Sequence, residues 1–205
     1  MNKSTLRRQL KAARQAVSPQ ARRCAARAAM RQATRAGLLL RARTMGFYLP
    51  QVAEFDVRPL IALAQRMGRR VCLPVLPRRG RVMRFARLRE GGAMRPNRYG
   101  IDEPVDPQPR RARQLDLLFL PLVGFDAQGH RLGMGGGYYD ATLAFMRHRG
   151  HWHKPRLIGV AYEGQRVDAL PHDPWDMPLD AVLTERGLYR FRRASAKKML
   201  VTRSA

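Results

Sequence analysis

Cysteines, acidic residues and long apolar runs are all scarce in this chain of 205 residues. Its two cysteines, Cys24 and Cys72, lie far apart and outside any Cys-x-x-Cys pair. This excludes a disulfide framework and favours a reducing cytoplasm. No apolar run approaches the roughly 20 residues that a membrane-spanning helix needs, so we expect no membrane span and no membrane partner. The start of the chain lacks the apolar core of a secretory signal.

Acidic residues are missing altogether from both ends of the chain. The formal net charge is +25, but residues 1–43 hold twelve basic residues and no acid, and residues 186–205 hold seven and no acid. The body between them has 21 basic and 15 acidic residues, a net charge of only +6. Basic ends could bind nucleic acid, but no helix-turn-helix, RNP or zinc-finger pattern accompanies them and aromatic residues are few. We therefore expect no specific nucleic-acid partner. A mitochondrial transit peptide is the other alternative for the start, although hydroxyl residues are scarce there.

Helical and strand patterns alternate along the chain. The patterns predict helices over 3–17, 19–35 and 57–67 and from Tyr138 onward, strands over 44–49, 71–75, 117–123, 156–162 and 181–184, and a half-exposed strand over 81–88. Short apolar strands between helices are typical of an α/β fold, with a mainly parallel sheet flanked by helices in three layers. We expect a single domain over residues 1–191 and a basic, flexible tail over 192–205.

The stretch that carries the functional hypothesis reads as strand, glycine loop and helix. The apolar run Leu117 to Val123 precedes four glycines, which are Gly133, Gly135, Gly136 and Gly137. Glycine lets a backbone approach a ligand closely, and the first amides of a helix point outward unpaired, as a phosphate site needs. No Gly-Lys-Ser/Thr closes the loop, and Tyr138 replaces the last glycine of a dinucleotide fingerprint. On these residues alone, a phosphate site and a plain tight turn both remain open.

Several carboxylates stand near predicted element ends. Asp140 lies in the first turn after the glycines, Asp176 and Asp180 at the end of a later strand, and Glu54 and Asp56 after the first strand. One or two carboxylates suffice for Mg²⁺, which keeps most of its waters. The alternatives are that Asp140 offsets the helix dipole and that Asp56 caps the next helix.

Two other groups of residues have plain explanations. Lys3 and Arg7 lie on a polar face of the first predicted helix, where solvated charges are common. His148, His151 and His153 raise the question of zinc, but their spacing matches no common site and no carboxylate or thiol stands beside them. We therefore expect no zinc there.

Residues 124–140 strongly resemble the signature of the 5-formyltetrahydrofolate cyclo-ligases, also called methenyltetrahydrofolate synthetases. In this chain the stretch reads Gly-Phe-Asp-Ala-Gln-Gly-His-Arg-Leu-Gly-Met-Gly-Gly-Gly-Tyr-Tyr-Asp. Further matching pieces follow in order: Lys3 to Arg7, Tyr48-Leu49 with Glu54, Leu73-Pro74-Val75, Gly100-Ile101 with Glu103-Pro104, residues 158–162 with Gln165, and residues 175–180. The resemblance leaves only the tail unaccounted for.

This resemblance implies an ATP- and Mg²⁺-dependent conversion of 5-formyltetrahydrofolate to 5,10-methenyltetrahydrofolate, with release of ADP and phosphate. The formyl oxygen would attack the γ-phosphate, and N10 of the folate would then close the ring. No covalent nucleophile of the protein is needed, and the glycine loop has no Ser-His-Asp or Cys-His arrangement around it. The expected partners are two small molecules, a reduced folate and ATP, and we expect a monomer.

The resemblance also implies roles for individual residues. Those implied to bind ATP are Lys3, Arg7, Arg131, Leu132, Gly133, Met134, Gly135, Gly136, Gly137, Tyr138 and Tyr139. Those implied to bind the folate are Leu49 and Glu54, near its pterin end, with Met134, Gly135, Gly136, Gly137 and Tyr138. Asp140 and Asp176 would hold Mg²⁺, and Arg131 and Tyr138 would act in catalysis. A relative that has lost activity is an alternative, but the retained Glu54, Arg131, Asp140 and Asp176 argue against it.

One departure from the family pattern concerns charge. Some members carry basic residues inside the loop, at the positions of Met134 and Gly136. Phosphate charge would then be met by backbone amides, Mg²⁺, Arg131 and the N-terminal cations. We expect weaker nucleotide affinity and a stronger dependence on Mg²⁺, and a gain in ATP affinity in Met134→Arg.

Overall fold

A mainly parallel sheet forms the centre of the protein, as predicted. The computed structural model describes residues 2–147, 154–173 and 175–191, so the expected tail and the three histidines at 148–153 lie outside the described residues. The seven strands run in the order β11-β10-β9-β6-β1-β2-β3. Their bounds are β1 Thr44–Gly46, β2 Arg70–Val75, β3 Arg84–Arg87, β6 Leu117–Pro121, β9 Arg156–Val160, β10 Ala181–Leu183 and β11 Leu188–Arg190. The five strands from β10 to β2 pair in parallel, and the edge strands β3 and β11 are antiparallel.

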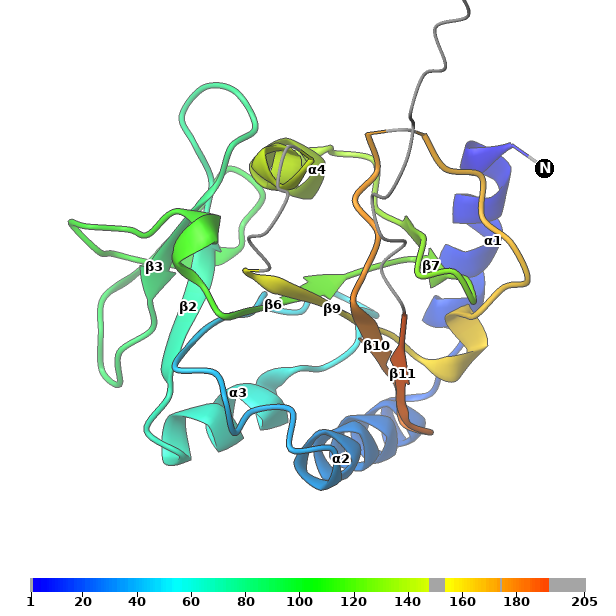
Figure 1. Ribbon diagram of the computed structural model, residues 1–205, viewed down its shortest axis with the longest axis horizontal. Coiled ribbons are helices and arrows are strands. Elements are labelled where there is room, and N and C mark those ends of the chain that lie inside the picture. The colour runs from blue at the N-terminus through cyan, green and yellow to red at the C-terminus, as the bar shows by residue number, and fades with distance from the viewer. Residues whose placement is uncertain (1, 148–153, 174, 192–205) are drawn as a thin grey trace, which may run out of the picture.

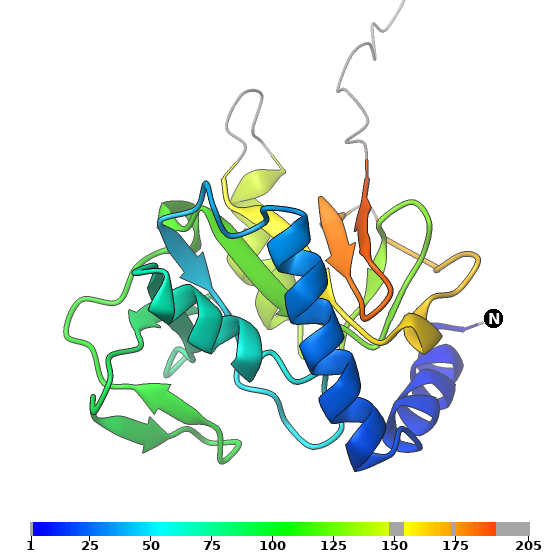
Figure 2. The same ribbon diagram turned by 90° about the horizontal axis from the view of Figure 1, so that it is seen from below.

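Helices cover both faces of this sheet, which gives the predicted three layers. Helices α2 (Pro19–Arg35) and α3 (Arg58–Arg66) lie on one face, and α4 (Tyr138–Leu143) lies on the other (Figures 1 and 2). Helix α1 (Lys3–Gln15) lies at the side of the molecule, near β7 (Gly124–Phe125), as Figure 1 shows. Among the described residues, none of the helices combines the length and the apolar character that crossing a bilayer requires.

Strand β6 shows why the central apolar run is continuous. Leu117 and Phe119 belong to the core beneath α2 and α3, where Phe119 stacks on Phe47 with ring centroids 4.3 Å apart. Leu118 and Leu120 belong to the second core, beneath α4. Successive side chains of a strand point to opposite faces, so a strand buried on both faces needs apolar residues at every position.

Several predicted boundaries need correction. Helix α4 ends at Leu143 and is followed by the 3₁₀ turn η2 (Ala144–Met146), so the helix behind the glycine loop is only six residues long. Three elements had no prediction: the strand β11, the hairpin of β4 (Met94–Pro96) with β5 (Asp102–Pro104), and the hairpin of β7 (Gly124–Phe125) with β8 (Arg131–Leu132). The remaining short elements are the 3₁₀ turns η1 (Ala112–Gln114) and η3 (Glu163–Gln165).

Candidate active site

A cavity of about 440 Å³ opens at the carboxyl ends of the central strands. Its floor includes Pro74 of β2 and Pro121 of β6, and its walls come from α1, the glycine loop and the turn of the β4–β5 hairpin. The carboxyl edge of a parallel sheet is where ligands of open α/β folds bind, and the volume suits a small-molecule site.

Every residue predicted for the ATP, folate and metal sites lines this single cavity. These are Lys3, Arg7, Leu49, Glu54, Arg131, Leu132, Gly133, Met134, Gly135, Gly136, Gly137, Tyr138, Tyr139, Asp140 and Asp176. The fold thus brings together segments that are far apart in sequence, since Lys3 and Asp176 are separated by 173 positions. Their common location is observed, and their individual roles stay predictions.

The glycine loop adopts a backbone that favours glycine. Gly135 has φ of +99° and Gly137 has φ of +68°, and both lie in the left-handed region that side chains disfavour. Arg7 of α1 holds the loop from one side, because its Nε donates to the carbonyl of Gly133 at 2.8 Å. With only six residues in α4, the helix dipole is weaker than predicted, so positive charge near the loop must come largely from side chains.

Only 5% of the Arg131 side chain is exposed, compared with 28% for Lys3. It donates through Nη2 to the carboxylate of Asp140 and through Nη1 to the carbonyl of Met177 at 2.9 Å. Two contacts therefore fix the guanidinium in one orientation beside the loop. The Asp140 carboxylate keeps 34% of its side chain exposed and remains open to the cavity.

Lys3 forms the second charge cluster, with two carboxylates. Its Nζ lies 2.5 Å from Oδ2 of Asp173 and 2.9 Å from Oδ2 of Asp176, and the amide of Asp173 also donates to Asp176 at 2.9 Å. Burial raises the pKa of Asp176, but the bonds from the Asp173 amide and from Lys3 outweigh burial and lower it overall. Burial lowers the pKa of Lys3, and the two carboxylates more than reverse this effect.

The expected position of Asp176 at a strand end was wrong. Asp176 lies in the loop between η3 and β10, and Asp180 directly precedes β10. The Asp180 carboxylate accepts from the amide of Leu157, near the start of β9, at 2.7 Å. Asp180 therefore lies at the end of the sheet opposite the cavity and is poorly placed to assist a metal there.

Asp140 and Asp176 fit a magnesium ion that arrives with a nucleotide. Within residues 2–147, 154–173 and 175–191 no group of three or more His, Cys, Asp or Glu side chains could hold a metal. Mg²⁺ on a nucleotide, however, commonly takes one or two protein carboxylates together with phosphate oxygens. The donor set therefore suits Mg²⁺ bound with phosphates and not a metal centre made of protein side chains alone.

Glu54 lines the same cavity as the two charge clusters. Only 8% of Glu54 is exposed, and its Oε2 accepts from the amide of Gln51 at 3.0 Å. Burial, followed by the Glu54 charge, raises the pKa of both Tyr48 and Tyr139 well above the usual value, so both phenols stay neutral. Tyr139 is partly buried, because it packs against the core beneath α4. Glu54 therefore offers one buried carboxylate to the cavity, which Leu49 also lines.

Comparison with known proteins supports the resemblance. The sequence model of the 5-formyltetrahydrofolate cyclo-ligase family matches residues 1–185. The chain belongs to this family. The 5-formyltetrahydrofolate cyclo-ligase of Escherichia coli K12 is 40% identical over 148 residues, which are 70% of this chain and 78% of the relative. That of Haemophilus influenzae is 37% identical over 151 residues, 69% of this chain and 75% of the relative.

Solved structures agree with this membership in the cyclo-ligase family. The NMR structure of 5,10-methenyltetrahydrofolate synthetase from Aquifex aeolicus is similar over the full length of both chains, with 27% identity and a TM-score of 0.79. The 5,10-methenyltetrahydrofolate synthetase from Mycoplasma pneumoniae covers 90% of this chain and 99% of its own, with a TM-score of 0.68. At 23% identity this second likeness concerns the fold alone.

The β4–β5 hairpin of this cyclo-ligase contributes Tyr99 and Glu103 to the cavity lining, and neither had a predicted role. Arg98 donates through Nη2 to the hydroxyl of Tyr138 at 2.7 Å, and the hydroxyl of Tyr99 lies 3.1 Å from the same oxygen. The bond with Tyr99, followed by Arg98, lowers the pKa of Tyr138. Glu103 accepts from the amide of Leu76 at 2.9 Å and so ties the hairpin to the end of β2. In the sequence, only the matching pieces Gly100-Ile101 and Glu103-Pro104 of the resemblance indicated that this hairpin contributes to the site.

Proposed function

We propose that this chain is an ATP- and Mg²⁺-dependent 5-formyltetrahydrofolate cyclo-ligase that forms 5,10-methenyltetrahydrofolate, ADP and phosphate. The observation that carries the proposal is the convergence, in one cavity, of the glycine loop, the two charge clusters and the buried Glu54. The glycine loop and the charge clusters suit a polyphosphate with its cation. The carboxylate of Glu54 suits the amino-pyrimidine edge of a pterin.

Each part of the cavity has a task in this reaction. Glu54 accepts hydrogen bonds from the pterin and sets the position of the formyl group. Arg7 and Lys3 bind the nucleotide from the side of α1, and the loop amides surround its phosphates. Bound Mg²⁺, held by Asp140 and Asp176, would neutralise phosphate charge during transfer.

Arg131 is the residue best suited to a catalytic role. Its guanidinium is buried and fixed before any ligand arrives, so no reorganisation is needed when charge develops on the transferred phosphoryl group. The formyl oxygen attacks the γ-phosphorus as the bond to ADP breaks. N10 then attacks the activated formyl carbon, phosphate leaves with the C–O bond electrons, and N10 loses its proton. The enzyme contributes position and charge stabilisation and needs no covalent intermediate of its own.

The proposal is tested by following the absorbance of methenyltetrahydrofolate during incubation of 5-formyltetrahydrofolate with ATP and Mg²⁺. We expect product from the wild type, none after chelation of Mg²⁺, and a rate roughly 100-fold lower in Asp140→Asn. Asp168→Asn, at an exposed carboxylate outside the cavity lining, is the matched control and should keep wild-type turnover. A folded wild type that forms no product would disprove the proposal.

The cellular setting and the assembly state belong to the same proposal. We expect a cytoplasmic monomer, with residues 1–191 as the catalytic domain and residues 192–205 dispensable for turnover. The described thiols of Cys24 and Cys72 are both free, which suits a reducing compartment. Size-exclusion chromatography with light scattering would test the monomer.

A further inference from the structure

The glycine loop lacks cations of its own, but an arginine from another segment lies against it. Between Leu132 and Gly137 the chain has no basic residue. The side chain of Arg81, in the connection between β2 and β3, runs along Gly137 on the side where a Cβ would project. A Cβ built there would lie 3.2 Å from Nη1 of Arg81 and 3.7 Å from its Cδ. Glycine at 137 therefore leaves room for this guanidinium as well as permitting the backbone turn.

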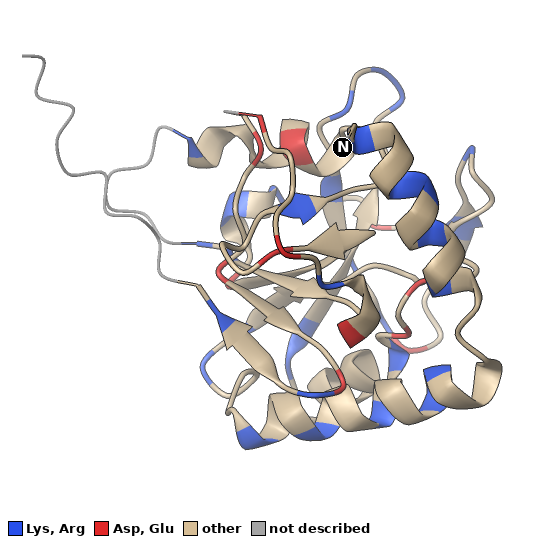
Figure 3. Ribbon diagram, turned by 90° about the vertical axis from the view of Figure 1, so that its right-hand side faces the viewer, with Lys and Arg blue, Asp and Glu red and all other residues tan. Residues whose placement is uncertain are grey.

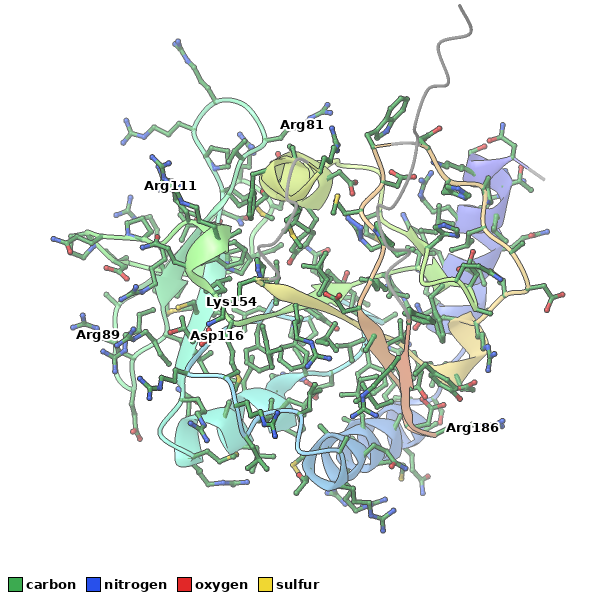
Figure 4. All side chains as sticks on the ribbon, in the orientation of Figure 1. Arg81, Arg89, Arg111, Asp116, Lys154 and Arg186 are labelled. Atoms are coloured by element: carbon green, nitrogen blue, oxygen red, sulfur yellow. The ribbon has the colours of Figure 1, made fainter. Side chains whose placement is uncertain are left out.

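The backbone near Arg81 is anchored to the helix that follows the loop. The amide of Met83 donates to Oγ1 of Thr142 in α4 at 2.9 Å, and the same hydroxyl lies 3.4 Å from the carbonyl of Arg81. Figure 4 places Arg81 beside α4. The two ends of the contact, Arg81 and Gly137, are thus both fixed relative to α4.

No carboxylate neutralises Arg81 among the ion pairs of the described residues, unlike Lys3 and Arg131. After the larger effects of Tyr99 and Arg98, its charge also lowers the pKa of the neighbouring Tyr138, whose hydroxyl accepts from Arg98. An exposed arginine with no acid partner, adjacent to a loop that lines the cavity, is available for an anion bound at that loop.

We infer that Arg81 is a phosphate-binding residue, which supplies from the β2–β3 connection the positive charge that the glycine loop lacks. The inference rests on the proposed function, because it takes the anion at the loop to be the nucleotide polyphosphate. Arginine suits this role since its planar guanidinium can donate two parallel hydrogen bonds to phosphate oxygens. The glutamate carboxylates of the folate are the competing anion, and the experiment below separates the two.

The test measures equilibrium binding without turnover, by calorimetry of ATP with Mg²⁺ and, separately, of 5-formyltetrahydrofolate. Arg81→Gln removes the charge, and Arg79→Gln is the matched control. Both arginines are exposed in the same connection and neither is among the residues that line the cavity, but the side-chain atoms nearest to a Cβ at Gly137 belong to Arg81. We expect ATP affinity to fall about tenfold in Arg81→Gln and to stay at the wild-type level in Arg79→Gln. The affinities of Arg81→Gln for folate and AMP should be unchanged. The double variant Arg81→Gln with Met134→Arg should recover part of the lost ATP affinity.

Each other outcome would overturn the assignment. Wild-type ATP affinity in Arg81→Gln, or no recovery in the double variant, would remove the phosphate role. A loss of folate affinity in place of ATP affinity would assign Arg81 to the folate carboxylates. A wild type that binds no ATP at all would instead disprove the proposed function, so the two failures are distinguishable. Circular dichroism of each variant establishes that it is folded.

Discussion

Helices α1 and α2 are both rich in arginine and free of acids, yet they stand in opposite relations to the cavity. In α1, Lys3 and Arg7 line the cavity and bond to Asp173, Asp176 and the glycine loop. In α2, the basic residues Arg23, Arg27, Arg31 and Arg35 are exposed, and alanines form its buried face. Figure 3 shows the Lys and Arg positions along both helices. The same composition serves a binding site in one helix and a solvated surface in the other, so net charge by itself says little about a partner.

Removal of the Lys3 ammonium should have the largest effect. Lys3→Met leaves Asp173 and Asp176 close together without their cation and removes a contact proposed for ATP. We expect kcat/KM for ATP to fall roughly 100-fold, measured by the methenyltetrahydrofolate assay. If Lys3→Met kept more than half of the wild-type kcat/KM for ATP, the proposed difference in role between α1 and α2 would be wrong.

The next effect should come from Arg7, with a matched change in α2. Arg7→Gln loses the bond from Nε to the Gly133 carbonyl, so the loop is less well held and KM for ATP should rise about tenfold. Arg27→Gln, at an exposed arginine of α2, should change neither KM nor kcat. Equal effects from the two substitutions would show that overall charge, and not position, matters.

The pH dependence of stability should reveal the carboxylate side of the Lys3 cluster. The pKa of Asp176 is lowered in the folded state, so its contribution is present above the unfolded pKa of about 4 and is lost as pH falls through the folded pKa. Asp176→Asn lacks this contribution. In urea unfolding, the free energies of wild type and variant should therefore differ at pH 6 and converge below about pH 4. A difference that stays constant with pH would contradict the pairing.

The smallest effect on activity should follow from neutralising α2. Replacement of Arg23, Arg27, Arg31 and Arg35 by glutamine should leave turnover within about twofold, because none of them lines the cavity. Retention on a polyanion column should weaken, since nonspecific phosphate attraction scales with the number of cations. Deletion of residues 192–205 should behave in the same way. A loss of turnover in either variant would give the basic surface a catalytic role.

Much of the fold could be predicted from local patterns, and much of the cavity could not. The helical spacing of its alanines and the cap at its N-terminus identify α2 well. Ser18 accepts a hydrogen bond from the amide of Ala21, and Pro19 is the first residue of the helix. The continuous apolar run of β6 marks the central strand. The strands of the two missed hairpins are two or three residues long, too short for a periodic signal.

Long-range pairing had no local signal at all. Nothing near Lys3 indicates that Asp173 lies beside it, and nothing near Gly137 indicates Arg81. The resemblance gave Lys3 a role because its matching pieces include both Lys3 to Arg7 and residues 175–180, which are far apart in the sequence. Arg81 lies outside the pieces of the resemblance, so only the folded arrangement points to it.

The pairing of Lys3 with its two carboxylates also has a consequence during protein synthesis. Asp173 and Asp176 are synthesised 170 and 173 residues after Lys3. Until they emerge, the ammonium of α1 has neither partner, and the glycine loop that Arg7 holds is also still to come. The cavity can therefore be completed only after Asp173 and Asp176 have been synthesised, and a ribosome-bound chain halted before residue 173 should not bind nucleotide.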